Sequence, residues 1–188
     1  MKSLRTISMM AFAAAVLFAS VAQAAPTASV RIGDQLWDAA TVKPNQQFDV
    51  HIVLSGFDAS VNAVEYKVNM PNDFAVISNS YGFSGALDFG STTGSGNAIG
   101  FGECVPMFQV SQGSDDVIVH TIRLFSMGFV DLSPITLSAF EGGSDDPTSP
   151  RYSTCGGPAL DMESEGAMIA VTTVSNEGDS WGAVKALY

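Results

Sequence analysis

The sequence predicts an all-β protein, an antiparallel β-sandwich of about nine strands. Apolar and polar residues alternate at a period of two in several segments, as they do in strands with one buried face. Clusters of Gly, Pro, Asn and Asp separate these segments, and no long helical pattern interrupts them. Many short strands of this kind favour two antiparallel sheets packed face to face.

Residues 1–24 are predicted to be a signal peptide. Lys2 and Arg5 precede a short apolar run, which ends in the small-x-small pattern Ala22-Gln23-Ala24 that signal peptidase cleaves. Because no stop-transfer pattern follows the run, we expect cleavage and no membrane span. The mature protein is then expected to be secreted, periplasmic or displayed on a bacterial cell surface.

Residues 25–174 are predicted to form one sandwich domain, because no linker divides them and they suffice for a hydrophobic core. The chain carries 8 Lys and Arg against 19 Asp and Glu, a net charge of −11. Such a surface repels nucleic-acid phosphates and anionic lipid headgroups, so we expect no nucleic-acid partner. This charge is typical of solubility outside the cell, and the alternative is a patch for cations or a basic partner.

The only two cysteines, Cys104 and Cys155, are predicted to form a disulfide. An oxidising compartment favours disulfides, and two cysteines allow a single pairing. The alternative is a pair of free or metal-binding thiols, for which a Cys-x-x-Cys spacing or a nearby His is missing.

The first predicted strand is 28–32. In the next two, 48–54 and 64–70, every even-numbered residue is apolar. Tyr66 and Met70 are the largest inward residues of the second, so we expect this strand to contribute most to the core. The polar stretches 91–97 and 141–150 are expected to be loops. The remaining predicted strands are 74–78, 98–101, 106–110, 118–124, 135–139 and 168–174.

Both histidines fall inside predicted strands. The alternation places His51 on the outward face of its strand, and it places His120 on the same face as Ile118 and Ile122. A metal site or a catalytic triad needs several such groups together. We therefore interpret the two histidines as surface or core-edge residues.

Two segments resemble cohesin domains and, more broadly, the related bacterial carbohydrate-binding β-sandwiches. Residues 41–52, TVKPNQQFDVHI, resemble the K-P-G-D turn and second strand of that family, with Asn45 and Gln46 where Gly and Asp are usual. Residues 62–76, NAVEYKVNMPNDFAV, are similar to its next strand, Asp-Pro-like turn and strand, with Pro71-Asn72 in place of Asp-Pro. The resemblance implies a jelly-roll sandwich that binds protein or glycan without catalysis. The disulfide and the 141–155 loop lie outside the usual pattern, so no binding residue carries over.

Acidic turns leave a structural calcium site open, and no other cofactor is expected. Calcium prefers several hard oxygens on one flexible loop, but the EF-hand order is missing. The alternative is ordinary solvated turn residues. The acids concerned are Asp115, Asp116, Glu141, Asp145 and Asp146.

Glycan binding needs exposed aromatic rings with polar groups that fix orientation. The candidate rings are Trp37, Tyr81, Phe83 and Phe89, and the alternative is that these rings fill the core.

We predict an exported, non-catalytic binding or scaffolding domain whose partner is an extracellular or cell-surface protein. A polysaccharide-binding module is the first alternative, and an extracellular hydrolase is the second, although no catalytic motif is evident. The tail 175–188 is predicted to be a short helix or disordered, with Trp181, Val184 and Tyr188 near one another if it is helical. It could lie on the domain, bind a partner or remain loose.

Overall fold

The computed structural model describes residues 25–107, 116–142 and 147–173. Thirteen strands form two sheets in these ranges, so the predicted all-β sandwich is confirmed. No helix in the described part of the chain is long and apolar enough to cross a membrane. The signal peptide, the tail, Asp115, Asp145 and Asp146 lie outside the described residues, and what the sequence predicts for them stays a prediction.

The first sheet has five strands. Their order is β12 (Glu163–Glu165), β1 (Thr27–Ile32), β3 (Gln47–Ser55), β8 (Val117–Ser126) and β5 (Phe74–Tyr81). β12 pairs with β1 in parallel, and every other neighbour in this sheet is antiparallel. β5 is therefore one edge of the sheet.

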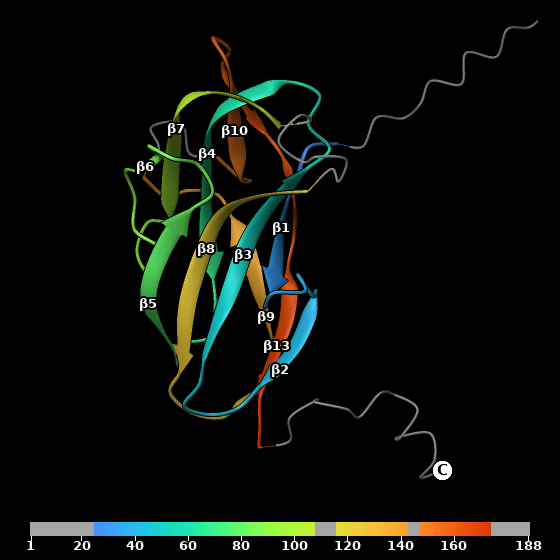
Figure 1. Ribbon diagram of the computed structural model, residues 1–188, viewed down its shortest axis with the longest axis vertical. Helices are drawn as coiled ribbons and strands as arrows, with labels where there is room; N and C mark the ends of the chain where they lie inside the picture. Colours follow the sequence, from blue (N-terminus) through green and yellow to red (C-terminus); the bar gives the residue numbers. More distant parts are fainter. Residues whose placement is uncertain (1–24, 108–115, 143–146, 174–188) are drawn as a thin grey trace, which may run out of the picture.

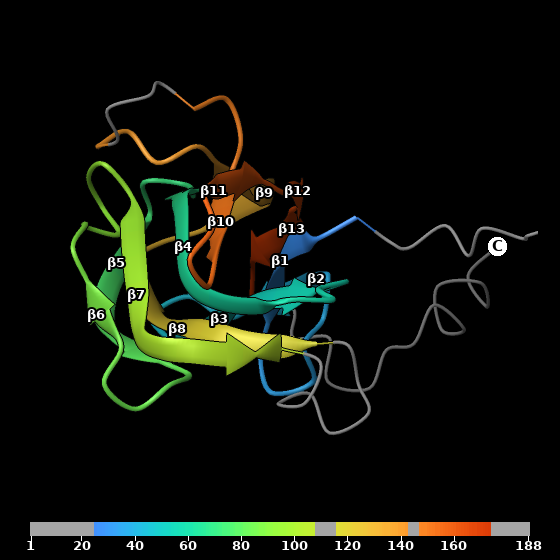
Figure 2. The ribbon, with the colours of Figure 1, turned by 90° about the horizontal axis from the view of Figure 1, so that it is seen from above.

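The second sheet has eight strands. Its main path is β11 (Ala159–Asp161), β10 (Arg151–Thr154), β4 (Ser60–Asn69), β9 (Val130–Ser138), β13 (Ala167–Val171) and β2 (Ala39–Val42). β7 (Asn97–Pro106) also pairs with β4, and β6 (Leu87–Asp88) pairs with β7. Figure 1 shows the strands running along the long axis, and Figure 2 shows β3 and β8 in one layer and β9, β10 and β11 in the other.

The core lies between the sheets, where the inward residues of the alternating strands meet. In β4, Val64, Tyr66 and Val68 are buried, and Met70 just beyond the strand packs against the core, as the sequence predicts. Tyr66 is fully buried and is the largest of the fully buried side chains. This agrees with the prediction that its strand contributes most to the core.

A bulge in β8 changes the face on which His120 lies. Ile52 pairs with His120 but Val53 pairs with Ile118, so Val119 is an extra residue between the two pairs. Ile118 is 36 % exposed whereas His120 is 0 % exposed, and the predicted shared face of these two residues is wrong. The uninterrupted alternation that the prediction assumed ends at the bulge.

His51 lies between the inward residues Val50 and Ile52 and so faces outward, as predicted. It is nevertheless buried, and its Nδ1 lies 2.9 Å from the Thr121 hydroxyl. Of the surface and core-edge positions that the sequence leaves open, the surface position is wrong, since the residue is only 9 % exposed.

The count of thirteen strands exceeds the predicted nine for a simple reason. β2, β6, β10, β11 and β12 have only two to four residues each, too few for a period of two to stand out. Conversely, β7 runs through the predicted gap between 98–101 and 106–110, with Gly102 at a φ of +76° and a register shift opposite β4. Residues 108–110 lie outside the described ranges.

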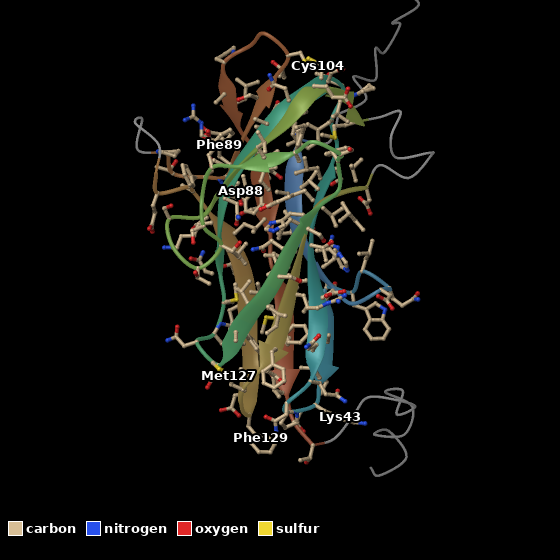
Figure 3. All side chains as sticks on the ribbon, turned by 60° about the vertical axis from the view of Figure 1, so that its left-hand side comes forward. Lys43, Asp88, Phe89, Cys104, Met127 and Phe129 are labelled. Atoms are coloured by element: carbon tan, nitrogen blue, oxygen red, sulfur yellow. A yellow bond between two sulfur atoms is a disulfide. The ribbon has the colours of Figure 1, made fainter. Side chains whose placement is uncertain are left out.

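Cys104 and Cys155 form the predicted disulfide, with their Cα atoms 5.8 Å apart. The bond joins the end of β7 to the turn after β10, on the two sides of β4, at the end of the sandwich where Cys104 is labelled in Figure 3. The two strands that flank β4 in the second sheet are thus cross-linked at one end.

Candidate functional site

The outer face of the second sheet carries small side chains where β10, β4, β7 and β6 run side by side. Ala63 pairs with both Ser153 and Gly100, and Gly100 pairs in turn with Leu87. These residues point outward, because the next residues along the strands, Val64 and Ile99, are fully buried. The sheet surface is therefore low and open here, without bulky side chains in its middle.

Two exposed apolar side chains border this surface on β6 and just beyond it. Leu87 is 61 % exposed and Phe89 is 77 % exposed. The Phe89 ring lies over β7, with its Cε2 atom 3.7 Å from the place a Cβ of Gly100 would take, and Figure 3 shows Phe89 beside Asp88. We call this surface the shelf, defined as Ala63, Leu87, Phe89, Ala98, Gly100 and Ser153.

Charged groups lie along one side of the shelf. Glu65 pairs in register with Ala98 on one side and Arg151 on the other, and Arg151 lies 3.8 Å from Asp161. Further along β4, Lys67 donates a hydrogen bond of 2.8 Å to Glu141. An exposed apolar surface bordered by charged residues is a pattern found at protein–protein interfaces.

Asp88 lies between Leu87 and Phe89 in sequence but points into the sandwich. Its carboxylate accepts four hydrogen bonds, and two of them come from backbone amides. The donors are the Tyr81 hydroxyl at 3.0 Å, Asn97 Nδ2 at 2.5 Å, Gly90 N at 2.9 Å and Ala98 N at 3.0 Å. Burial acts to raise the pKa of Asp88, but these hydrogen bonds together hold that pKa below its usual value, so the group is a carboxylate at neutral pH.

A chain of buried and part-buried hydrogen bonds continues from Asn97 to the core. Asn97 Nδ2 donates to Thr92 Oγ1 at 3.0 Å, and Thr92 Oγ1 donates to Asn79 Oδ1 at 3.2 Å. His120 Nε2 lies 3.0 Å from the same Asn79 oxygen, and His120 Nδ1 lies 2.8 Å from the Tyr66 hydroxyl. The chain therefore links β6 and β7 to β5, β8 and β4.

The groups in this chain are neutral hydrogen-bonding partners. Burial lowers the pKa of His120 to about 4, and the ring stacks on Tyr81 with centroids 5.0 Å apart. Because Asn79 offers an oxygen, His120 Nε2 carries the proton and Nδ1 accepts from Tyr66. Burial raises the pKa of Tyr66 well above its usual value, and burial with the bond to Asp88 raises the pKa of Tyr81 to about 12. Both phenols thus remain donors.

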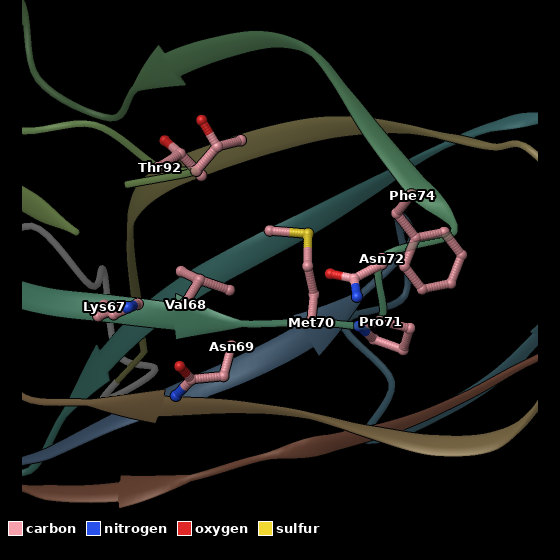
Figure 4. A pocket seen from close by; sticks show the side chains of 9 residues that line it. Lys67, Val68, Asn69, Met70, Pro71, Asn72, Phe74 and Thr92 are labelled. Carbon is pink, nitrogen blue, oxygen red and sulfur yellow. The ribbon is translucent and has the colours of Figure 1, made fainter. Parts of the chain in front are cut away.

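A groove of about 300 Å³ lies between the end of β4 and the turn that carries Thr92 (Figure 4). Met70 stands in its middle, and two of its polar residues are already paired: Lys67 with Glu141, and Asn69 with Ser138. A second groove, of about 320 Å³, contains Asp49 and Arg123, which form two hydrogen bonds of 2.8 Å.

The four candidate aromatic residues do not form one platform. Trp37 is 55 % exposed and bridges Ile32 beside β1, in the first sheet, whereas Phe89 lies over the second. Tyr81 and Phe83 are half-buried against the core, with Phe83 in contact with Phe101 at 4.7 Å between ring centroids. Trp37 and Phe89 are thus surface residues, and Tyr81 and Phe83 take the alternative role of filling the core.

The two candidate calcium ligands in the described residues, Asp116 and Glu141, do not form a common site. Glu141 pairs with Lys67, and Asp116 is exposed at the start of β8. Within residues 25–107, 116–142 and 147–173, no group of three or more His, Cys, Asp or Glu side chains could hold a metal ion. The calcium site stays a prediction, because the other three acids lie outside these ranges.

Sequence reasoning missed this chain of polar residues. Thr92 and Asn97 belong to a stretch predicted to be a loop, yet both are buried. One signal was available: in Leu87-Asp88-Phe89, the alternation of strands requires a polar residue to face inward if the two apolar ones face outward.

No family model matches the sequence, and no curated protein does. Solved structures do match. A cohesin module from a Clostridium perfringens family 33 glycoside hydrolase has 12 % identity over 79 % of this chain and 97 % of its own, with a TM-score of 0.56. A non-cellulosomal cohesin from the archaeon Archaeoglobus fulgidus has 11 % identity over 86 % and 98 %, with a TM-score of 0.52.

The sixth cohesin of scaffoldin B from Acetivibrio cellulolyticus, solved in complex with a Cel5 dockerin, has 11 % identity over 79 % of this chain and 99 % of its own, with a TM-score of 0.50. At these identities the similarity establishes the fold alone. The chain is an antiparallel β-sandwich. Its fold is cohesin-like, which confirms the resemblance found at residues 41–76.

Proposed function

We propose that this protein is an exported, non-catalytic domain that binds a partner protein through the shelf. The observation that carries this proposal is the exposure of Leu87 and Phe89 beside a sheet surface lined by Ala63, Ala98 and Gly100. Exposed leucine and aromatic side chains next to a low surface, with charged residues along one side, provide the apolar centre that a protein partner can cover.

The chemistry of the partner follows from the charge. With a net charge of −11, the chain favours a partner whose apolar centre is surrounded by basic residues. A protein partner also agrees with the cohesin-like fold, since the Acetivibrio cellulolyticus cohesin was solved bound to a dockerin. The predicted signal peptide and the disulfide support a place outside the cytoplasm.

Other exposed apolar residues are weaker candidates for the binding site than the shelf. Met127 and Phe129 lie at the opposite end of the molecule from Phe89 (Figure 3). They follow β8 and precede β9, so they belong to a turn rather than to a sheet surface. Turns offer less continuous area for a partner than four paired strands do.

The test places a photo-crosslinking amino acid at position 89 and, as a matched control, at position 37. Trp37 is an exposed aromatic residue outside the shelf, so both variants display the probe to solvent. Each is incubated with the secreted and cell-surface proteins of the source organism. We expect one discrete protein to be cross-linked from position 89 and not from position 37.

The captured protein is then purified and its affinity measured. Phe89→Ala should weaken binding by about tenfold or more, as for a central interface residue, while changing the free energy of unfolding by less than about 0.5 kcal/mol. Equal binding by the wild type, Leu87→Ala and Phe89→Ala would refute the shelf as the binding site.

Glycan binding remains the second candidate, and the exposed Phe89 ring is the observation in its favour. A glycan array with the wild type and Phe89→Ala tests it. Retention of a glycan that is lost in the variant would favour this function over a protein partner.

A further inference from the structure

The two exposed residues of the shelf lie on a very short strand and just beyond it. β6 consists of Leu87 and Asp88 alone, and it pairs with β7. The pairing continues a short way past β6, where Phe89 N donates to Ala98 O at 2.9 Å and Ser91 bridges Gly96. A pairing this short opens easily, so strand pairing alone holds Leu87 and Phe89 weakly.

We propose that Asp88 is the positioning residue of the shelf: its carboxylate anchors β6 so that Leu87 and Phe89 face outward over β7. This inference rests on the proposed function, because it assigns a role within the same binding surface. Asp88 does not touch the partner. It acts through the two residues that flank it.

The four hydrogen bonds of the carboxylate come from three places in the chain. Tyr81 is the last residue of β5, Gly90 follows Phe89, and Asn97 and Ala98 begin β7. One anionic group thus joins the end of the first sheet to the start of a strand in the second. Hydrogen bonds to a charged acceptor are stronger than neutral ones, which suits a single residue that holds three segments.

The alternation of side chains along β6 means that anchoring Asp88 also sets the direction of Leu87 and Phe89. Because Asp88 points inward beside the fully buried Ile99, the residues before and after it must point outward. If the carboxylate left its site, β6 could rotate and both apolar side chains would turn with it.

Asn97 extends the anchor to the core. Its side chain is buried, and its Nδ2 donates two hydrogen bonds, one to Asp88 and one to Thr92. From Thr92 the chain reaches Asn79 and His120. The position of β6 is therefore fixed against the interior of the sandwich and not only against its neighbour.

The test uses Asp88→Asn, which keeps the shape but presents an NH₂ group to the donors of Tyr81 and Asn97. Asp58→Asn is the matched control, since Asp58 is exposed and loses the same charge. In the free protein, hydrogen exchange followed by NMR should show the amides of Phe89, Gly90 and Ala98 exchanging about tenfold faster or more in Asp88→Asn. The amide of Ile52 in β3 should keep its protection in both variants.

Binding of the protein cross-linked from position 89 gives the second readout. Asp88→Asn should weaken it by about tenfold, and the double variant Asp88→Asn/Asn97→Asp, in which an amide again faces a carboxylate, should recover part of the loss. If Asp88→Asn fails to fold, Tyr81→Phe replaces it, because it removes one donor and should give smaller changes in the same direction.

The two ideas fail in different ways. Unchanged exchange at Phe89, Gly90 and Ala98 in a folded Asp88→Asn, or unchanged affinity where Phe89→Ala loses it, overturns the positioning role. Faster exchange with no partner captured from position 89 would leave Asp88 as the anchor of β6 and refute the proposed function alone.

Discussion

The hydroxyl of Tyr66 lies 2.8 Å from Nδ1 of His120, and this hydrogen bond crosses the interior of the sandwich from β4 to β8. Both side chains are fully buried. A hydrogen bond in such a site compensates two polar groups that would each be costly to bury alone. The pair therefore fixes how the two sheets lie against each other, in addition to the apolar contacts of the core.

Truncating Tyr66 should separate the contribution of its ring from that of its hydroxyl. Tyr66→Ala is expected to lower the free energy of unfolding by about 3–5 kcal/mol, because it leaves a cavity in the core. Tyr66→Phe keeps the ring but leaves His120 Nδ1 without a donor, and should cost about 1–3 kcal/mol. Urea unfolding measures both. A Tyr66→Phe variant as stable as the wild type would contradict the role assigned to the hydrogen bond.

His120 should make stability depend on pH between about 4 and 6.5. Burial lowers its pKa from 6.5 to about 4 in the folded protein, so the unfolded chain takes up a proton that the folded chain refuses. Stability is then expected to fall as the pH falls through this window, by up to about 3 kcal/mol in total.

Urea unfolding at several pH values measures this slope, and His120→Gln is the comparison. Burial also lowers the pKa of His51, which acts in the same direction, so the variant should flatten the slope without abolishing it. An identical slope in the wild type and in His120→Gln would rule out His120 as its source.

Local alternation predicts the long strands well. β3, β4 and β8 each have nine or ten residues and a buried face, so the apolar period is visible in the sequence. It fails at Ile118 and His120, because a bulge depends on which strand pairs opposite and adds one residue to the count. Register is a property of two strands, and a single segment does not reveal it.

The shelf and the role of Asp88 could not be predicted from the sequence for a related reason. Phe89 is among the four candidate rings, but its place over Gly100 follows from the pairing of β6 with β7, which a single segment does not reveal. Asp88 was one acid among 19 and had no motif to distinguish it. Its partners, from Tyr81 to Ala98, are brought together by the packing of β5, β6 and β7. Their spacing in the sequence matches no known motif and so does not predict a site.

Gly96 should tolerate a side chain poorly. Its φ is +105°, and a Cβ there would lie 2.5 Å from the Tyr66 carbonyl oxygen in β4. Gly96→Ala is expected to lower the free energy of unfolding by about 2–5 kcal/mol, from backbone strain and steric overlap together. Gly33→Ala is the control: its φ is +70° but nothing lies within 4 Å, so about 1 kcal/mol is expected. Thermal unfolding of both variants makes the comparison, and equal losses would show that close contact with β4 does not matter.

Removing the tail should leave the domain intact. Strand periodicity in the sequence stops at Val174, and β13 ends at Val171, so the sequence predicts that residues 176–188 are not needed by the sheets. A helix of fewer than about 12 residues is marginal alone, so Trp181, Val184 and Tyr188 need a surface to cover if they are to be helical.

If that surface belongs to a partner, the isolated domain gains nothing from the tail, and a chain ending at residue 175 should melt within about 2 °C of the full one. Differential scanning calorimetry of the two proteins, each with its disulfide formed, measures this. At about 2–4 °C per kcal/mol, a fall of about 10 °C would mean that the tail contributes several kcal/mol of packing. In that case the three apolar residues lie against the sandwich itself, and the tail is part of the folded domain.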